Sequence, residues 1–112
     1  MERQGQQSDA KEDTAKVKIR VQAEAKEILN KVYKEAYEVC KEANKLADEV
    51  YKEAKKLSVD KQAVKEADRI RKEAKKEADR VRDLLIAEAN AAFRISFDEA
   101  TEKYNETMAK LK

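Results

Sequence analysis

Apolar residues recur along the first half of the chain in blocks of eleven. Within each block the spacings are three, four and four residues, which place the apolar positions on one side of a helix. Eleven residues make about three helical turns, so the stripe runs almost straight along that face. Its members are Thr14, Val17, Val21, Ala25, Ile28, Val32, Ala36, Val39, Ala43, Ala47, Val50 and Ala54. The pattern predicts a long helix over about residues 14–57 that pairs with another helix along a seam.

The repeat slips near residue 58. Continued in the same phase, the stripe would next fall on three polar residues, Ser58, Lys61 and Lys65. It reappears instead with Ala67, two residues early, and a loss of two residues rotates the helix face by roughly 200°. One unbroken helix would then carry its stripe on opposite sides of its two halves. The slip therefore predicts a turn at residues 57–60.

A second helix is expected over about residues 60–112. Ser58 or Asp60 can cap its first amides, and a cap at Asp60 would make Val59 and Val64 a hydrophobic staple. The eleven-residue repeat later gives way to heptads, at Ile86, Phe93, Ala100 and Thr107 and at Asn90, Phe97, Tyr104 and Leu111. The predicted fold class is all-α: a long antiparallel two-helix hairpin that resembles a coiled coil, hendecad first and heptad afterwards.

The first thirteen residues are polar, contain the only glycine and show no apolar period. This composition predicts a disordered N-terminal tail over residues 1–13. Asp13 or Thr14 would then act as the N-cap of the first helix, because either side-chain oxygen can accept a hydrogen bond from an early helix amide. The helical hairpin is expected to occupy residues 14–112.

Residues 84–97 are apolar on nearly every side of the second helix. Their expected partner segment, about residues 20–33, covers only one of those sides. We therefore expect a homodimer, in which two hairpins form a four-helix bundle at the open end. The predicted interface consists of Val21, Ile28, Val32, Tyr33, Leu84, Leu85, Ile86, Phe93 and Phe97. Asn90 falls on a core heptad position, where it either faces water at the edge of the seam or fixes the register of the interface.

The composition excludes several kinds of chemistry. The chain has 112 residues, no His, one Gly and one Cys. Without His there can be no Ser-His-Asp triad, one Gly excludes a phosphate-binding loop, and one Cys excludes a thiolate zinc site. We therefore expect no enzyme, no catalytic residue, no cofactor and no metal. Cys40 is expected to be a small buried hydrophobe rather than a redox thiol.

The apolar runs are too short to cross a membrane, which takes about 20 residues. The chain begins without the apolar segment of a signal peptide, and its single Cys forms no internal disulfide. These features predict a cytoplasmic protein with no membrane span. The Ala-rich stripe suits close helix packing better than insertion into a membrane surface, which needs bulkier side chains.

Residues 61–82 hold nine Lys or Arg residues and five acidic residues. A net charge of +4 there could bind phosphates, as in an accessory nucleic-acid-binding protein. The same residues can also form pairs four apart on a solvated face, such as Asp68 with Lys72 and Arg69 with Glu73. No aromatic residue lies between these charges, as single-strand binding would require. We therefore do not expect a nucleic-acid partner.

The repeat is clearest where Lys65-Glu66-Ala67-Asp68-Arg69 returns as Lys76-Glu77-Ala78-Asp79-Arg80. Over about residues 25–89, this Lys-Glu-Ala repeat in a hendecad frame resembles the peripheral-stalk subunits of rotary ATPases. The resemblance implies a stalk-like coiled-coil subunit of a larger complex, although the predicted turn departs from a single stalk helix. From the residues themselves we expect a non-enzymatic structural or protein-interaction module, an oligomeric helical scaffold whose protein partner is unknown.

Overall fold

The chain folds into two long helices joined by a short turn. The structure, a computed structural model, describes the backbone of residues 2–111 and the side chains of residues 9–111. Helix α1 spans Glu2–Leu57 and helix α2 spans Lys61–Lys110. The predicted all-α antiparallel hairpin is confirmed.

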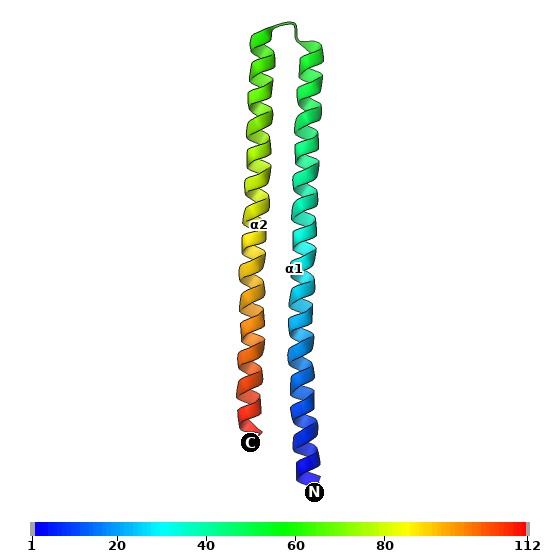
Figure 1. Cartoon of the computed structure of the whole chain (residues 1–112), viewed down its shortest axis with the longest axis vertical. Coiled ribbons are helices and arrows are strands. Elements are labelled where there is room, and N and C mark those ends of the chain that lie inside the picture. Colours follow the sequence, from blue (N-terminus) through cyan, green and yellow to red (C-terminus); the bar gives the residue numbers. More distant parts are fainter. Residues whose placement is uncertain (1, 112) are drawn as a thin grey trace. The chain divides into compact units, whose positions relative to one another are not determined.

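The hairpin divides into two units, which we name by their position in the chain. The terminal unit comprises Met1–Lys31 and Ala89–Lys112, and the turn unit comprises Val32–Glu88. In each unit a segment of α1 lies beside a segment of α2 that runs in the opposite direction (Figure 1). The terminal unit contains both chain ends, and the turn unit contains the connection between the helices.

Helix α1 begins earlier than the sequence pattern indicates. It starts at Glu2, so the helix includes most of the segment for which we expected a disordered tail; Met1 lies outside the described residues. Thr14 lies inside the helix and not at its start, since its Oγ1 donates a 2.7 Å hydrogen bond to the carbonyl oxygen of Ala10. This bond to the residue four positions back is typical of a threonine within a helix. The expected start near residue 14 is therefore corrected: a polar segment without proline can extend a helix that is already nucleated.

The turn lies where the phase slip predicts it. Helix α1 ends at Leu57, and Asp60 caps α2 by accepting a 3.0 Å hydrogen bond at Oδ1 from the amide of Gln62. Ser58 Oγ accepts a 3.3 Å bond from the amide of Asp60. The predicted staple was wrong, because Val59 is fully exposed.

The interior of the hairpin is thin. Among the described residues, the buried hydrophobic ones are Ala36 and Cys40, 3% and 5% exposed, both on α1 in the turn unit. Half-buried residues continue this seam on both helices of the turn unit, namely Ala47, Tyr51, Ala54, Val64, Ala67 and Ala78. Small side chains at most of these positions let the two helices approach closely.

Several larger aliphatic residues of the repeat lie at the side of the seam. The β-branched residue at the middle position of each eleven-residue block is exposed: Val17 47%, Ile28 63%, Val39 61% and Val50 59%. Helix α2 repeats the pattern with Ile70 at 53% and Val81 at 37%. The stripe that we expected to face the opposite helix therefore splits: alanines such as Ala36 and Ala47 lie in the seam, whereas the middle residue of each block lies beside it.

Candidate protein-interaction surface

On one side of the turn unit, charged and aromatic side chains from both helices cover the seam between them. The guanidinium of Arg71 lies 4.0 Å from the ring centre of Tyr51, and that of Arg82 lies 5.3 Å from the ring centre of Tyr37. Cation–π contacts of this kind hold the arginine stems across the seam. We call this surface the charged side of the turn unit.

Asp48 provides the ion pairs of the charged side. Its Oδ1 lies 2.7 Å from Nζ of Lys75 and 3.8 Å from Nη1 of Arg71, so one carboxylate on α1 joins two cations on α2. The hydrogen bond from Lys75, followed by the charges of Lys75 and Arg71, holds the pKa of Asp48 below its usual value. In the described part of the chain, the ion pairs between α1 and α2 all involve this carboxylate.

Cys40 is buried beside these charges, as the sequence predicts. Its Sγ donates a 3.3 Å hydrogen bond to Oδ1 of Asp79, and Nη1 of Arg82 lies 3.9 Å from the sulfur. Burial raises the pKa of the thiol, and the bond to Asp79 raises it further, although Arg82 acts in the opposite direction. The thiol therefore stays protonated, and a protonated thiol is a poor nucleophile.

The opposite side of the seam forms an apolar groove of about 350 Å³. We call it the turn-unit groove. Apolar residues of both helices make most of its lining, and Glu77 and Arg82 are its charged members. The full lining is Ala36, Val39, Cys40, Ala43, Ala74, Glu77, Ala78, Val81, Arg82 and Leu85. Several apolar members, such as Val39 and Ala43, are exposed to solvent. The two sides of the same seam thus differ sharply in chemistry.

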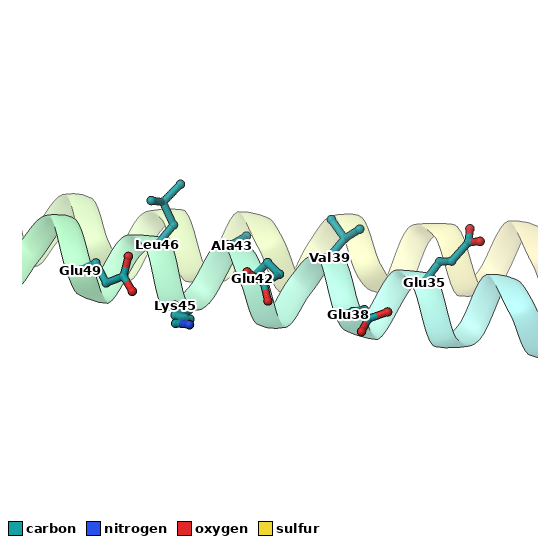
Figure 2. Close-up of a pocket in the computed structure, with 8 residues that line it drawn as sticks. All are labelled: Glu35, Glu38, Val39, Glu42, Ala43, Lys45, Leu46 and Glu49. Carbon is teal, nitrogen blue, oxygen red and sulfur yellow. The ribbon is translucent and has the colours of Figure 1, made fainter.

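The outer edge of α1 beside this groove is acidic. Val39 and Leu46 point to one edge of the helix, whereas Glu38 and Lys45 point to the other (Figure 2). The surface hollow there, of about 570 Å³, is lined by Glu35, Glu38, Val39, Glu42, Ala43, Lys45, Leu46 and Glu49. The charges of Glu38 and Lys45 cancel, so Glu35, Glu42 and Glu49 give this edge a net charge of −3. We call it the acidic edge of α1.

The corresponding edge of α2 is electrically balanced. Ile70 and Ala74 lie there among two acidic and two basic residues, Glu73, Lys76, Glu77 and Arg80. Arg80 forms ion pairs with Glu77, and the hydrogen bond between them lowers the pKa of that carboxyl group. One of the two cations of this edge, Arg80, is thus already paired along its own helix.

The two ion pairs that the sequence predicts within residues 61–82 are present. Nζ of Lys72 lies 3.2 Å from Oδ2 of Asp68, and Nη1 of Arg69 lies 2.7 Å from Oε1 of Glu73. Arg69 also contacts Glu66, and this hydrogen bond lowers the pKa of the glutamate. The sequence did not predict that Arg71 and Arg82 would stack on tyrosines of the other helix.

The terminal unit holds five residues of the predicted site. The rings of Phe93 and Phe97 lie with their centres 5.6 Å apart, and Phe97 is 39% exposed. Val21 lines an apolar groove between the helices, Ile28 is 63% exposed, and Asn90 is exposed in the single chain. These residues share one unit, but the interface that they were predicted to form remains a prediction.

Polar contacts that sequence reasoning missed also hold the terminal unit together. Nε2 of Gln22 donates to Oγ1 of Thr101 at 2.9 Å and to the carbonyl oxygen of Phe97 at 3.3 Å. Nζ of Lys18 lies 4.6 Å from the ring centre of Tyr104. Gln22 and Lys18 lie near the seam positions of α1, and this could have predicted the contacts from the sequence, because a polar residue there needs a partner on α2.

The other predicted interface residues belong to the turn unit. Leu84 and Leu85 are 49% and 38% exposed, while Val32, Tyr33 and Ile86 are half-buried. Of these, Leu85 lines the turn-unit groove. The predicted interface therefore divides between the two units.

Comparison with known proteins gives no relative for this chain: no protein-family model, curated protein or solved structure matches it significantly. Within the described residues, neither helix has a stretch that is both long and apolar enough to span a bilayer. Among the same residues, no three or more His, Cys, Asp or Glu side chains form a cluster that could hold a metal ion.

Proposed function

We propose that this chain is a non-enzymatic helical scaffold that works by self-association. The observation that carries the proposal is the thinness of its interior: the buried hydrophobic residues among those described are one alanine and one cysteine, Ala36 and Cys40. A fold is stabilised chiefly by the apolar area that it removes from water. A hairpin with so little buried area gains a fuller core when other helices pack on it.

The exposed surface of the chain supports this proposal. The chain exposes 9178 Å², whereas a compact monomeric protein of its mass, 12.9 kDa, is expected to expose roughly 6,300 Å². A specific protein interface commonly removes about 800 Å² from each partner. The excess is therefore large enough for a standard interface, and even for more than one.

We place the dimer contact at the terminal unit, where Phe93 and Phe97 would be the anchors. Aromatic pairs contribute large apolar areas and are common at the centres of interfaces. A two-fold dimer that packs two such helix pairs together would form a four-helix bundle there. The single free Cys40 suits a reducing compartment, which is why we expect the scaffold in the cytoplasm.

Nucleic-acid binding is the weaker alternative. In the basic stretch, Arg69, Arg80 and Arg82 already contact carboxylates of their own helix, and Arg71 and Lys75 contact Asp48. Phosphates would have to compete with these pairs. A role as a stalk-like subunit of a larger complex agrees with the scaffold proposal, since both need helix association.

Light scattering of the native chain and of the Phe93→Ala, Phe97→Ala double variant tests the proposal. We expect the native mass to exceed that of one chain and the variant to approach it. Each phenylalanine that is fully buried in an interface contributes about 3–5 kcal/mol relative to alanine. Leu57→Ala serves as the control, because Leu57 is 79% exposed next to the turn. A native chain that stays a folded monomer at high micromolar concentration contradicts the proposal.

A further inference from the structure

The turn-unit groove has the form of a binding site for one more helix. Ala74 and Ala78 line it from α2 and Ala43 from α1, while Val39 and Val81 add larger side chains. Small residues allow a helix backbone to approach closely, and larger ones beside them interdigitate with its side chains. Both helices of the turn unit thus supply the small residues on which a docked helix can pack and the larger residues beside them.

The length of the apolar surface sets the length of the docked helix. On α2 the groove is lined from Ala74 to Leu85, and the exposed Ile70 beside Ala74 extends the apolar surface to about 22 Å at about 1.5 Å per residue. This distance corresponds to about four helical turns. A helix that fills it would present apolar anchors at spacings of four and three residues, as helices bound in grooves usually do.

The charges beside the groove select the kind of helix. The acidic edge of α1 carries a net charge of −3, and the edge of α2 is balanced. Glu35, Glu42 and Glu49 are seven residues apart and so follow one line along α1. Lysine or arginine on the flank of a docked helix would meet this line of carboxylates, whereas acidic residues there would be repelled.

A second copy of this chain fits the groove less well. Packed face to face, two turn units would set the acidic edge of α1 against either its own copy or the α2 edge of the other chain. The first arrangement opposes two edges of net charge −3. The second sets it against an edge with no net charge, where Arg80 is already paired with Glu77.

We infer that the turn-unit groove docks a basic amphipathic helix of a protein partner, about four turns long, whose apolar stripe is flanked by Lys or Arg. This interaction is separate from self-association through the terminal unit. It would leave the chain able to assemble and bind its partner at the same time.

Fluorescence anisotropy with two labelled peptides and the full chain tests the inference. The peptides share one helical sequence with leucines at spacings of four and three, and their flanks carry lysine in one and glutamate in the other. We expect the lysine peptide to bind with a Kd at least tenfold lower, and to weaken as salt is added. The net charge of the whole chain is +2, so non-specific attraction would favour the glutamate peptide instead.

Three variants locate the binding site. We expect the Val39→Gln, Val81→Gln double variant to raise the Kd of the lysine peptide at least tenfold. The control Ile19→Gln should bind as the native chain does, since Ile19 is exposed to the same extent as Val39, 65% against 61%. The Glu42→Lys, Glu49→Lys double variant should abolish the preference for the lysine peptide; its exposed positions keep this test valid if the groove variant does not fold.

Several results would overturn the inference. Equal affinity for the two peptides would remove the charge argument, and a groove variant that binds like the native chain would place the site elsewhere. A groove variant whose mass falls to that of one chain would show that a second copy occupies the groove. Self-association is measured by light scattering without peptide, so it can stand or fail independently of peptide binding.

Discussion

The two sides of the turn unit come from the same repeat but differ in what covers the seam. On the charged side, Arg71 and Arg82 lie over tyrosines and Asp48 joins the helices. On the groove side, Val39 and Val81 stand beside alanines and remain accessible to solvent. The first side is satisfied within the chain, and the second is available to another molecule.

This difference shows how one repeat can serve two purposes. Alanines in the seam hold the helices close, so each helix has an edge on either side of the contact. Tyrosines along one edge, such as Tyr37 and Tyr51, draw arginines across the seam. The β-branched residues along the other edge have no such cover. The position of a residue within the eleven-residue block thus decides whether its side chain lies in the seam or stays exposed beside it.

The largest effect is expected from enlarging an alanine in the seam. Ala36→Leu adds a large side chain at a position that is 3% exposed, and overpacking of this kind costs about 1–3 kcal/mol. The same change at Ala43, which is exposed in the groove, should alter the free energy of unfolding by less than about 0.5 kcal/mol. Urea unfolding of both variants measures the difference. Equal losses would show that the two sides are packed alike.

Removal of Arg82 should break part of the charged side. Arg82→Ala takes away the contact over Tyr37 and the contacts with Asp79 and Cys40. We expect Tm to fall by a few degrees. Arg80→Ala is the matched control, since Arg80 pairs with Glu77 on its own helix and is expected to change Tm little. If the two variants have the same Tm, the cross-helix contacts of Arg82 contribute nothing to stability.

A smaller effect is expected from acidification. The pKa of Asp48 is held below its usual value, first by the hydrogen bond from Lys75. Its contribution to stability is therefore present above the pKa of the unfolded carboxyl group, about 3.9, and disappears as pH falls through the lower folded value. Asp48→Asn should flatten the acid limb of a plot of urea midpoint against pH, and added salt should weaken the effect.

Glu49→Gln is the control for Asp48→Asn. Glu49 lies on the acidic edge of α1 and has no ion pair in the part of the chain that the structure describes. Its substitution should leave the acid limb as steep as in the native chain. A slope that changes equally in both variants would mean that bulk charge, and not the bond between Asp48 and Lys75, governs the acid response.

The mildest test concerns the reactivity of Cys40. Its pKa is raised by burial and by the bond to Asp79, so the thiolate should form at higher pH in the folded chain than in denaturant. Alkylation rates measured across pH 7–11 should therefore follow a curve displaced to higher pH in the folded protein. Coincident curves would show that the thiol is accessible and would reopen a redox role.

Much of the fold could be predicted from local pattern. The two-residue phase slip located the turn, because the direction of an apolar stripe is a geometric consequence of residue spacing. The cap at Asp60 and the pairs of Asp68 with Lys72 and Arg69 with Glu73 also followed from short spacings. Each of these features depends on residues within one or two helical turns.

The features that could not be predicted depend on both helices at once. Periodicity identified the stripe that contains Ala36 and Val39, but it could not show that the first would be buried and the second exposed. That division depends on how each helix is rotated about its axis, and the stacking of Arg71 on Tyr51 contributes to the rotation. The staple at Val59 failed for a related reason, since the path of the turn decides which way that side chain points.

The central claim is that the hairpin alone leaves its apolar stripe uncovered and gains stability by association. The most direct test is Tm of the native chain measured over a hundredfold range of protein concentration. For a dimer, mass action predicts a rise of about 2–4 °C for each tenfold increase. A Tm that is independent of concentration, together with the mass of one chain throughout the range, would contradict the claim.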